Sequence, residues 1–230
     1  MYLDKIKINN FRQFENEVID FDSNLTLIAG SNNSGKTSLL DFIEKVFSQE
    51  SKVNFTVQDF SICTIKKIKK KLEKLFQSIK NSDEMQKQKH IEELMKNKYA
   101  ISMCITIGYK KEDNISNFAE YLMELDDDKQ YFYFYFEYSG DIRKFAEDLE
   151  ENKEFFGSTN LLEHYIKTFK SSYYYCDSKF ELKYDIKKHE FQRLCNFKFI
   201  RANKKLSDEK LDKKFSIANS IITLLEYNES

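Results

Sequence analysis

The feature that most constrains this sequence of 230 residues is an octapeptide with two glycines, a lysine and a threonine at fixed spacing. It reads Gly30-Ser31-Asn32-Asn33-Ser34-Gly35-Lys36-Thr37 and fits the pattern G-x-x-x-x-G-K-[ST] of a phosphate-binding loop. An apolar run at 25–29 precedes it. After it, Leu39, Phe42, Ile43, Val46 and Phe47 follow the spacing of a helix that packs on a sheet. The order predicts a buried strand, a loop and a helix.

Each position of this loop has a physical role in binding phosphate. Glycine reaches backbone conformations that turn successive N–H groups inward, and a helix that begins near Lys36 points its positive end at the bound anion. Lys36 would contact the β- and γ-phosphates, the Thr37 hydroxyl would ligate Mg²⁺, and Ser38 adds a second hydroxyl. We therefore expect ATP and Mg²⁺ as cofactors, with residues 30–38 as the binding residues and Lys36 as the catalytic residue.

The alternative for this loop is an ordinary glycine-containing turn. A chance match to the pattern arises in about one chain in a hundred of this length. The chain has only five glycines and no proline, yet it places two glycines in this loop. The strand–loop–helix context favours nucleotide binding.

Composition excludes several classes of protein. Hydrophobic residues make up 41% and charged residues 33%, and the net charge is −1, so no overall charge draws the chain to DNA or to a membrane surface. There is no apolar run of a length that crosses a bilayer and no signal peptide at the N-terminus. The four cysteines stand singly, which excludes a local zinc knuckle and fits reduced thiols in the cytoplasm: Cys63, Cys104, Cys176 and Cys195.

The remaining pattern predicts one continuous mixed α/β domain. Strands are predicted at 2–8, 18–21, 99–109, 130–138, 173–176, 180–184 and 197–201. Helices are predicted at 65–98 with a break at 81–83, and at 115–125, 141–151, 159–170 and 212–227.

The first forty residues resemble a known family. Ile-Lys-Ile-Asn-Asn-Phe-Arg-Gln-Phe at 6–14, Val-Ile-Asp-Phe at 18–21 and the segment 25–40 resemble the ABC-type ATPase heads of RecF, SMC and OLD proteins. The resemblance continues more loosely through 57–60, the strands predicted near 99–109 and 130–138, and 199–204. It implies a P-loop NTPase fold, an ABC-ATPase-like N-terminal lobe with a mixed sheet, an antiparallel β flank on a parallel core and helical insertions. The lobe would span 1–230, divided into 1–48 with the loop and first helix, a helical insertion at 64–98, mixed β and helices at 99–201, and a helical or coiled-coil start at 203–230.

The resemblance also assigns roles outside the loop. It places Arg12 near the phosphates or the base of the nucleotide, whereas the alternative is a surface arginine on an edge strand. Gln58 or Asp59 could sense Mg²⁺ and the γ-phosphate, although a simple polar turn explains that segment as well.

The other motifs of such a head are missing from the sequence. The family needs an apolar strand that ends in Asp-Glu (Walker B), a Ser-Gly-Gly signature helix and a switch histidine. None of the candidates fits, because 122–127 reads as a helix end, 173–178 has serine in place of the catalytic base, and 139–141 has one glycine. His90, His164 and His189 lie in charged helical contexts and are expected to be solvated. We therefore expect an N-terminal fragment of a longer ATPase, inactive alone, with a degenerate but complete binding module as the weaker alternative.

Two further features have structural and functional interpretations. The alternating Tyr-Phe run at 131–136 could stack bases, but burial in a sheet is favoured because neighbouring side chains point to opposite faces. The lysine cluster at 66–74 could contact a phosphate backbone, whereas such charge runs on helices are usually solvated faces.

These observations favour an ATPase lobe that acts in DNA repair, DNA maintenance or anti-phage defence. In the resembling family ATP joins two heads and hydrolysis releases them, which implies a homodimer. The resemblance also implies two further partners, DNA for the parent protein and the C-terminal half of the same head for this lobe. It implies no membrane partner. A P-loop kinase or phosphotransferase would need a lid with several arginines, and the chain has four: Arg12, Arg143, Arg193 and Arg201. A non-hydrolysing nucleotide-binding module is the third alternative.

Overall fold

The structure is a computed structural model that describes residues 1–47, 55–96, 99–123, 130–152 and 161–194. The chain divides into two compact units, Met1–Cys195 and Asn196–Ser230. Only the first unit contains described residues. The strand predicted at 197–201 and the helix predicted at 212–227 lie outside them.

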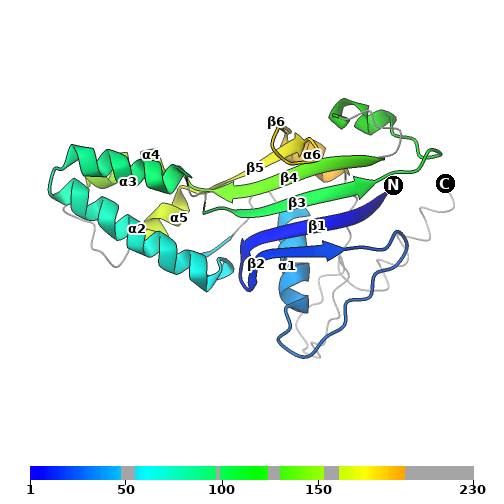
Figure 1. The fold of residues 1–230 in the computed structure, drawn as a ribbon, viewed down its shortest axis with the longest axis horizontal. Helices are drawn as coiled ribbons and strands as arrows, with labels where there is room; N and C mark the ends of the chain where they lie inside the picture. The colour runs from blue at the N-terminus through cyan, green and yellow to red at the C-terminus, as the bar shows by residue number, and fades with distance from the viewer. Residues whose placement is uncertain (48–54, 97–98, 124–129, 153–160, 195–230) are drawn as a thin grey trace, which may run out of the picture. The chain divides into compact units, whose positions relative to one another are not determined.

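The first unit is built on a six-stranded sheet in the order β2-β1-β3-β4-β5-β6 (Figure 1). The strands are β1 Tyr2–Phe11, β2 Phe14–Asp20, β3 Ile101–Gly108, β4 Tyr131–Ser139, β5 Lys170–Cys176 and β6 Lys183–Asp185. All five pairings are antiparallel. This confirms the α/β class and the antiparallel flank. The parallel core strands that the resemblance implies do not occur among the described residues.

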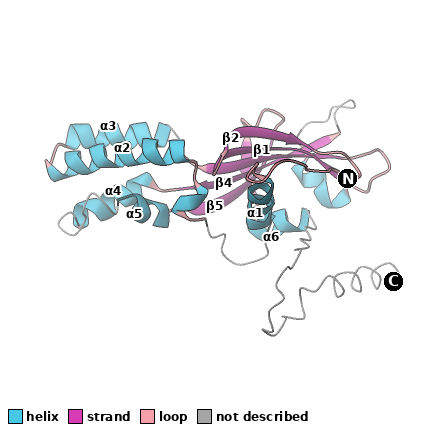
Figure 2. Cartoon of the chain, turned by 90° about the horizontal axis from the view of Figure 1, so that it is seen from below, coloured by secondary structure: helices cyan, strands magenta, loops and turns pink. Residues whose placement is uncertain are grey.

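Alternation along β4 gives the sheet two different faces. Phe132, Phe134 and Phe136 are almost completely buried, while the tyrosines between them, at 131, 133 and 135, are half-buried on the opposite face. The phenylalanine face is covered by α1 (Lys36–Phe47) and α6 (Lys188–Leu194), which lie together on one side of the sheet (Figure 2). The predicted burial is therefore confirmed for the phenylalanines.

Aromatic stacking fastens these two helices to the sheet. Phe42 of α1 stacks on Phe11 with ring centroids 4.5 Å apart, and Phe47 stacks on Phe191 of α6 at 5.4 Å. Phe191 also contacts Phe134 of β4. Such ring pairs stabilise a core beyond the area they bury.

Four helices gather at the end of the sheet where β1 ends and β3 begins (Figures 1 and 2). They are α2 Ile62–Lys80, α3 Glu84–Lys96, α4 Ile142–Glu151 and α5 Leu161–Lys167. The predicted break at 81–83 is confirmed, since Ser82 adopts a left-handed φ of 54° between α2 and α3. Short 3₁₀ helices occupy Val57–Asp59 (η1) and Ser116–Tyr121 (η2), the second in place of part of the predicted helix at 115–125.

The strand predicted at 25–29 is wrong for the described residues. This segment has no strand assignment, and Leu25 and Leu27 are 80% and 86% exposed. A strand needs a neighbour for its backbone N–H and C=O groups, and the segment pairs with neither edge of the sheet, β2 or β6. Its apolar pattern is that of a buried strand, but no described element covers it.

Two smaller predictions are also corrected. The strand predicted at 180–184 begins only at Lys183, because the Asp177 carboxylate accepts hydrogen bonds from the N–H groups of Glu181 and Leu182 and closes a turn. The short helix α6 was not predicted. Among the side chains of α6 that the structure describes, Phe191 supplies the buried apolar contact to the core, and one such residue gives little periodicity to read.

Candidate nucleotide site

The predicted phosphate-binding loop leads directly into α1, which begins at Lys36. Asn33 and Gly35 both adopt left-handed conformations, with φ of 69° and 95°. A Cβ at Gly35 would also lie 2.2 Å from the Gln13 side-chain nitrogen, so the end of that flexible side chain would have to move. The loop thus has the tight, glycine-dependent turn that an anion nest needs.

The Lys36 side chain folds back over this loop. Its Nζ donates to the carbonyl oxygens of Gly30 at 2.6 Å and Ser31 at 2.7 Å, and to Ser34 Oγ at 3.2 Å. Among the described residues no carboxylate pairs with this ammonium group. Its charge is therefore held by neutral oxygens, which phosphate oxygens can replace.

The start of α1 also fits an anion. Its first turn contains no acidic residue, so the positive end of the helix is not neutralised from within. The Thr37 side chain is exposed and that of Ser38 is half-buried. The donor set of backbone N–H groups, one ammonium and two hydroxyls suits a nucleotide phosphate with Mg²⁺.

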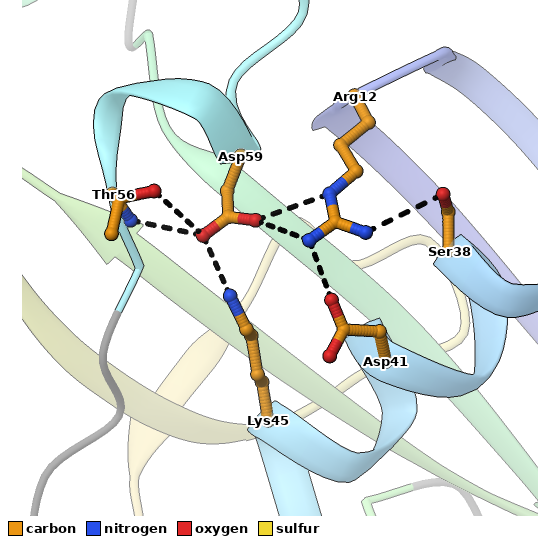
Figure 3. A network of polar contacts seen from close by, with 6 residues as sticks. All are labelled: Arg12, Ser38, Asp41, Lys45, Thr56 and Asp59. Atoms are coloured by element: carbon orange, nitrogen blue, oxygen red, sulfur yellow. Dashed lines mark hydrogen bonds and ion pairs between the residues drawn. The ribbon is translucent and has the colours of Figure 1, made fainter. Parts of the chain in front are cut away.

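Arg12 lies beside this helix, at the tight turn between β1 and β2 (Figure 3). Its backbone is left-handed, with φ of 48°, and its N–H donates to the carbonyl oxygen of Asp59 at 2.8 Å. The guanidinium donates through Nη2 to Asp59 at 2.8 Å and to Asp41 at 2.6 Å. Its Nη1 points to Ser38 Oγ at 3.5 Å, so one end of the fork is directed to the start of α1. The expected contact with nucleotide stays a prediction.

Asp59 is the centre of this network. Its side chain is only 3% exposed and receives Lys45 Nζ at 2.6 Å and the N–H of Thr56 at 2.9 Å. Burial by itself would raise the pKa of Asp59, but the hydrogen bonds from Lys45, Thr56 and Arg12 outweigh it and lower that pKa below its usual value. We call Arg12, Asp41, Lys45 and Asp59 the Arg12 network.

This network was only partly visible in the sequence. Asp59 was considered there as a possible Mg²⁺ sensor, and the structure places it inward against two cations, whereas Gln58 is exposed. Asp41 and Lys45 were missed. Their spacing of four residues on α1 was the available signal, because it puts an acid and a base on one helix face.

The other residues considered in the sequence have structural surroundings. Asp141 caps α4 by accepting from the N–H groups of Arg143 and Lys144, and Asp177 closes the β5–β6 turn. The expected solvation of the histidines is right only for His189, since His90 and His164 are half-buried. Residues 124–127 of one Walker B candidate are not described.

The described cysteines form no disulfide, and the described residues form no metal-binding cluster. Cys63, Cys104 and Cys176 are free, and burial raises the pKa of Cys176 to about 12. The described ranges contain no group of three or more histidine, cysteine or acidic side chains that could hold a metal ion. In the same ranges, no helix has both the length and the apolar character needed to cross a membrane.

Comparison with known proteins gives a family match over almost the whole chain. The model of the family described as AAA ATPase domain matches residues 1–229. The chain is 42% identical over 43 residues to the DNA replication and repair protein RecF of Acetivibrio thermocellus, covering 19% of this chain and 12% of RecF. It is 31% identical over 147 residues to the endonuclease GajA of Bacillus cereus, covering 55% of this chain and 20% of GajA.

Two further similarities are to a chromosome partition protein and to a solved structure. The chromosome partition protein Smc of Fusobacterium nucleatum is 38% identical over 60 residues, covering 26% of this chain and 5% of Smc. A solved structure from work on ATP-driven dimerization and DNA-stimulated activation of SMC ATPases aligns with 12% identity and a TM-score of 0.36, covering 84% of this chain and 76% of that one. The chain thus spans a fifth or less of the length of these curated relatives.

Proposed function

The chain belongs to the AAA ATPase domain family, and on that premise we propose that it is the ATP-binding N-terminal portion of an ABC-type ATPase. The parent protein would act in DNA repair, DNA maintenance or anti-phage defence, as the names of its relatives suggest. The observation that carries the proposal is the loop at 30–37. As far as the described residues show, neutral oxygens alone hold its ammonium group, at the start of a helix whose first turn has no acidic residue.

In this proposal the residues of the loop divide the work of holding ATP. Backbone N–H groups of Gly30, Ser31, Asn32, Asn33, Ser34 and Gly35 surround the phosphates, and Lys36 exchanges its loop carbonyls for β- and γ-phosphate oxygens. The hydroxyl of Thr37 ligates Mg²⁺, and Ser38 lies beside it. Bound Mg²⁺ would supply positive charge against the charge that develops on the phosphates during hydrolysis. Arg12 would add a donor from the side of Ser38.

Hydrolysis belongs to the parent protein in this proposal. No described residue fits the Walker B pair, so the carboxylate that polarises water would come from the C-terminal half of the same head. The exposed apolar run at 25–29 supports such a partner, as does the exposed Leu40 on the outer side of α1. The proposal includes one lobe over 1–230, a homodimer formed through ATP, DNA as a partner, and a cytoplasmic location.

Nothing among the described residues favours the phosphotransferase alternative. Arg12 is engaged by two carboxylates, and Arg143 and Arg193 lie on α4 and α6 rather than together in a lid. A non-hydrolysing module would share the loop, and only turnover by the full parent protein separates it from an ATPase.

The test is calorimetric titration of ATP with Mg²⁺ into the 230-residue chain and into Lys36→Ala. We expect the variant to lose at least about tenfold in affinity, because a charge-assisted bond to phosphate contributes about 1.5–3 kcal/mol. Its thermal midpoint should not change, since Lys36 lies at the surface of the loop. The matched control is Lys111→Ala, an exposed lysine outside the site, which should bind ATP as the parent does. Equal ATP affinity in Lys36→Ala and in the unsubstituted 230-residue chain would overturn the nucleotide assignment.

A further inference from the structure

One helix concentrates positive charge in a chain that is otherwise acidic. Helix α2 contains seven lysines and one glutamate, a net charge of +6, while the whole chain carries −1. Its buried stripe, which includes Ile68, Leu72, Leu75 and Ile79, packs into the helical group. Six lysines of the helix are exposed, Lys80 at its end and five closer together, which are called here the lysine face: Lys66, Lys67, Lys69, Lys70 and Lys74.

The lysine face forms a regular row. Lys66, Lys70 and Lys74 are four residues apart, so they follow one another at successive turns of the helix. The row from Lys66 to Lys74 spans about 12 Å at 1.5 Å per residue. Duplex DNA carries about seven phosphate charges over that length of its axis.

The described residues leave most of this charge unpaired, although the exposed Glu73 lies on the same helix. None of the five lysines forms an ion pair with a carboxylate in the part of the chain that the structure describes. The neighbouring Lys71 behaves differently, because its Nζ reaches the carbonyl oxygen of Glu93 and lies over the Tyr99 ring. Lys87 of α3 pairs with Glu84 and Glu150. Like charges four residues apart destabilise a helix, so an external polyanion would relieve a repulsion that the fold leaves in place.

We propose that the lysine face of α2 is a contact surface for the phosphate backbone of duplex DNA, which it would recognise by charge and not by sequence. The inference rests on the proposed function in taking DNA as the partner, and it adds the surface that would bind it. An anionic membrane fits less well. The large apolar side chains between 63 and 80 are buried or half-buried. Ile62, at the start of the helix, is 72% exposed, so the lysine face offers little to insert into lipid.

The lysine face also lies on a helix whose start is hydrogen-bonded to β1, close to the Arg12 network. Ser61 caps α2 and donates its N–H to the carbonyl oxygen of Asn10, and Thr64 donates to the Asn10 side chain at 2.9 Å. Asn10 lies at the end of β1, two residues before Arg12 in the turn, and Asp59 precedes Ser61 by two residues. DNA held on α2 would therefore sit on a helix anchored beside the Arg12 network.

The test measures binding of a labelled duplex of mixed sequence, about 30 base pairs long, to the 230-residue chain by fluorescence anisotropy between about 50 and 200 mM salt. The variant replaces Lys66, Lys70 and Lys74 by glutamine. The matched control replaces Lys110, Lys111 and Lys179, three exposed lysines elsewhere, so that the net charge changes equally. Thermal midpoints and titration with ATP on the same samples show that each protein is folded and binds nucleotide.

We expect the unsubstituted 230-residue chain to bind the duplex. The lysine-face variant should bind at least about tenfold more weakly at the lowest salt. The slope of log affinity against log salt should fall by about 2 to 3, since each phosphate contact contributes about 0.9. The control should lose less than about threefold.

Three results would overturn the inference. Equal weakening in both variants would show an effect of net charge alone. If the unsubstituted 230-residue chain binds ATP but not the duplex, the lysine face is not a DNA-binding surface, and the nucleotide proposal is unaffected. Tighter binding to vesicles that contain phosphatidylserine, lost in the lysine-face variant, would replace DNA by a membrane. If the unsubstituted chain binds the duplex but not ATP, the nucleotide proposal is overturned and the DNA-binding role of the lysine face is supported.

Discussion

The Arg12 network and the lysine face differ in whether their charged side chains are paired with side chains of opposite charge. The network joins two cations to two carboxylates around a side chain that is 3% exposed, and every charge in it has a partner. The lysine face carries five cations on an exposed helix surface, and among the described residues none of them pairs with a carboxylate, although Glu73 is exposed on the same helix. Burial makes an unpaired charge costly, whereas water screens an exposed one. The charges of the network are therefore paired within the fold, whereas the lysines of the lysine face can pair with a binding partner.

The largest effect should come from breaking the network at Asp59. We expect Asp59→Asn to lower the free energy of unfolding by about 3 kcal/mol, the lower part of the range for a broken buried ion pair. The loss is at the lower end because Lys45 and Arg12 are 22% and 32% exposed and can turn toward water. Urea unfolding followed by circular dichroism measures it. The control is Asp20→Asn, whose pair with Lys5 is exposed on both sides and whose loss should not be measurable.

The pH dependence of unfolding separates lost charge from lost packing in that variant. The pKa of Asp59 is lowered in the folded state, so its contribution is present above the unfolded value near pH 4 and is lost as pH falls through the lower, folded value. The difference in stability between the parent and Asp59→Asn should therefore shrink below about pH 4. A difference that stays constant down to pH 2 would mean that packing, and not ionisation, supports the site.

Arg12→Lys should have an intermediate effect and shows whether the network also serves the nucleotide. Lysine keeps the charge but lacks the fork that reaches Asp59, Asp41 and Ser38 together, so we expect stability to fall by about 1–2 kcal/mol. If Arg12 also contacts phosphate, ATP affinity should fall by about tenfold, measured by calorimetry. Lower stability with unchanged affinity would assign Arg12 to the network alone. Arg193→Lys, on the exposed side of α6, is the control and should change neither quantity.

The smallest effect should come from the lysine face and should have the opposite sign. Replacing Lys66, Lys70 and Lys74 by glutamine removes two like-charge pairs at a spacing of four residues and keeps helix propensity. We expect the free energy of unfolding to rise by about 0.5 kcal/mol at low salt and to become less sensitive to salt. Urea unfolding at two salt concentrations measures this. A fall in stability would show that these lysines contribute to the fold and would contradict the comparison.

Prediction from the sequence succeeded where the signal is local. The alternation of Tyr and Phe at 131–136 gave β4 and its buried face, and the break at 81–83 gave the boundary between α2 and α3. It failed at 25–29, where an apolar run was read as a buried strand and no described element covers it. Whether a strand is formed and buried depends on a neighbour, and a single segment does not contain that information.

The sequence alone predicted the phosphate-binding loop, because its pattern lies within eight consecutive residues from Gly30 to Thr37. It also determined the lysine face, since a spacing of four on a helix with a clear apolar stripe fixes which side chains are exposed. Only the tertiary structure decided the Arg12 network. Arg12 and Asp59 are 47 positions apart and meet because the β1–β2 turn, η1 and α1 pack together. Burial at that meeting point then makes full pairing of the charges necessary, and burial is a property of the folded chain rather than of any segment of it.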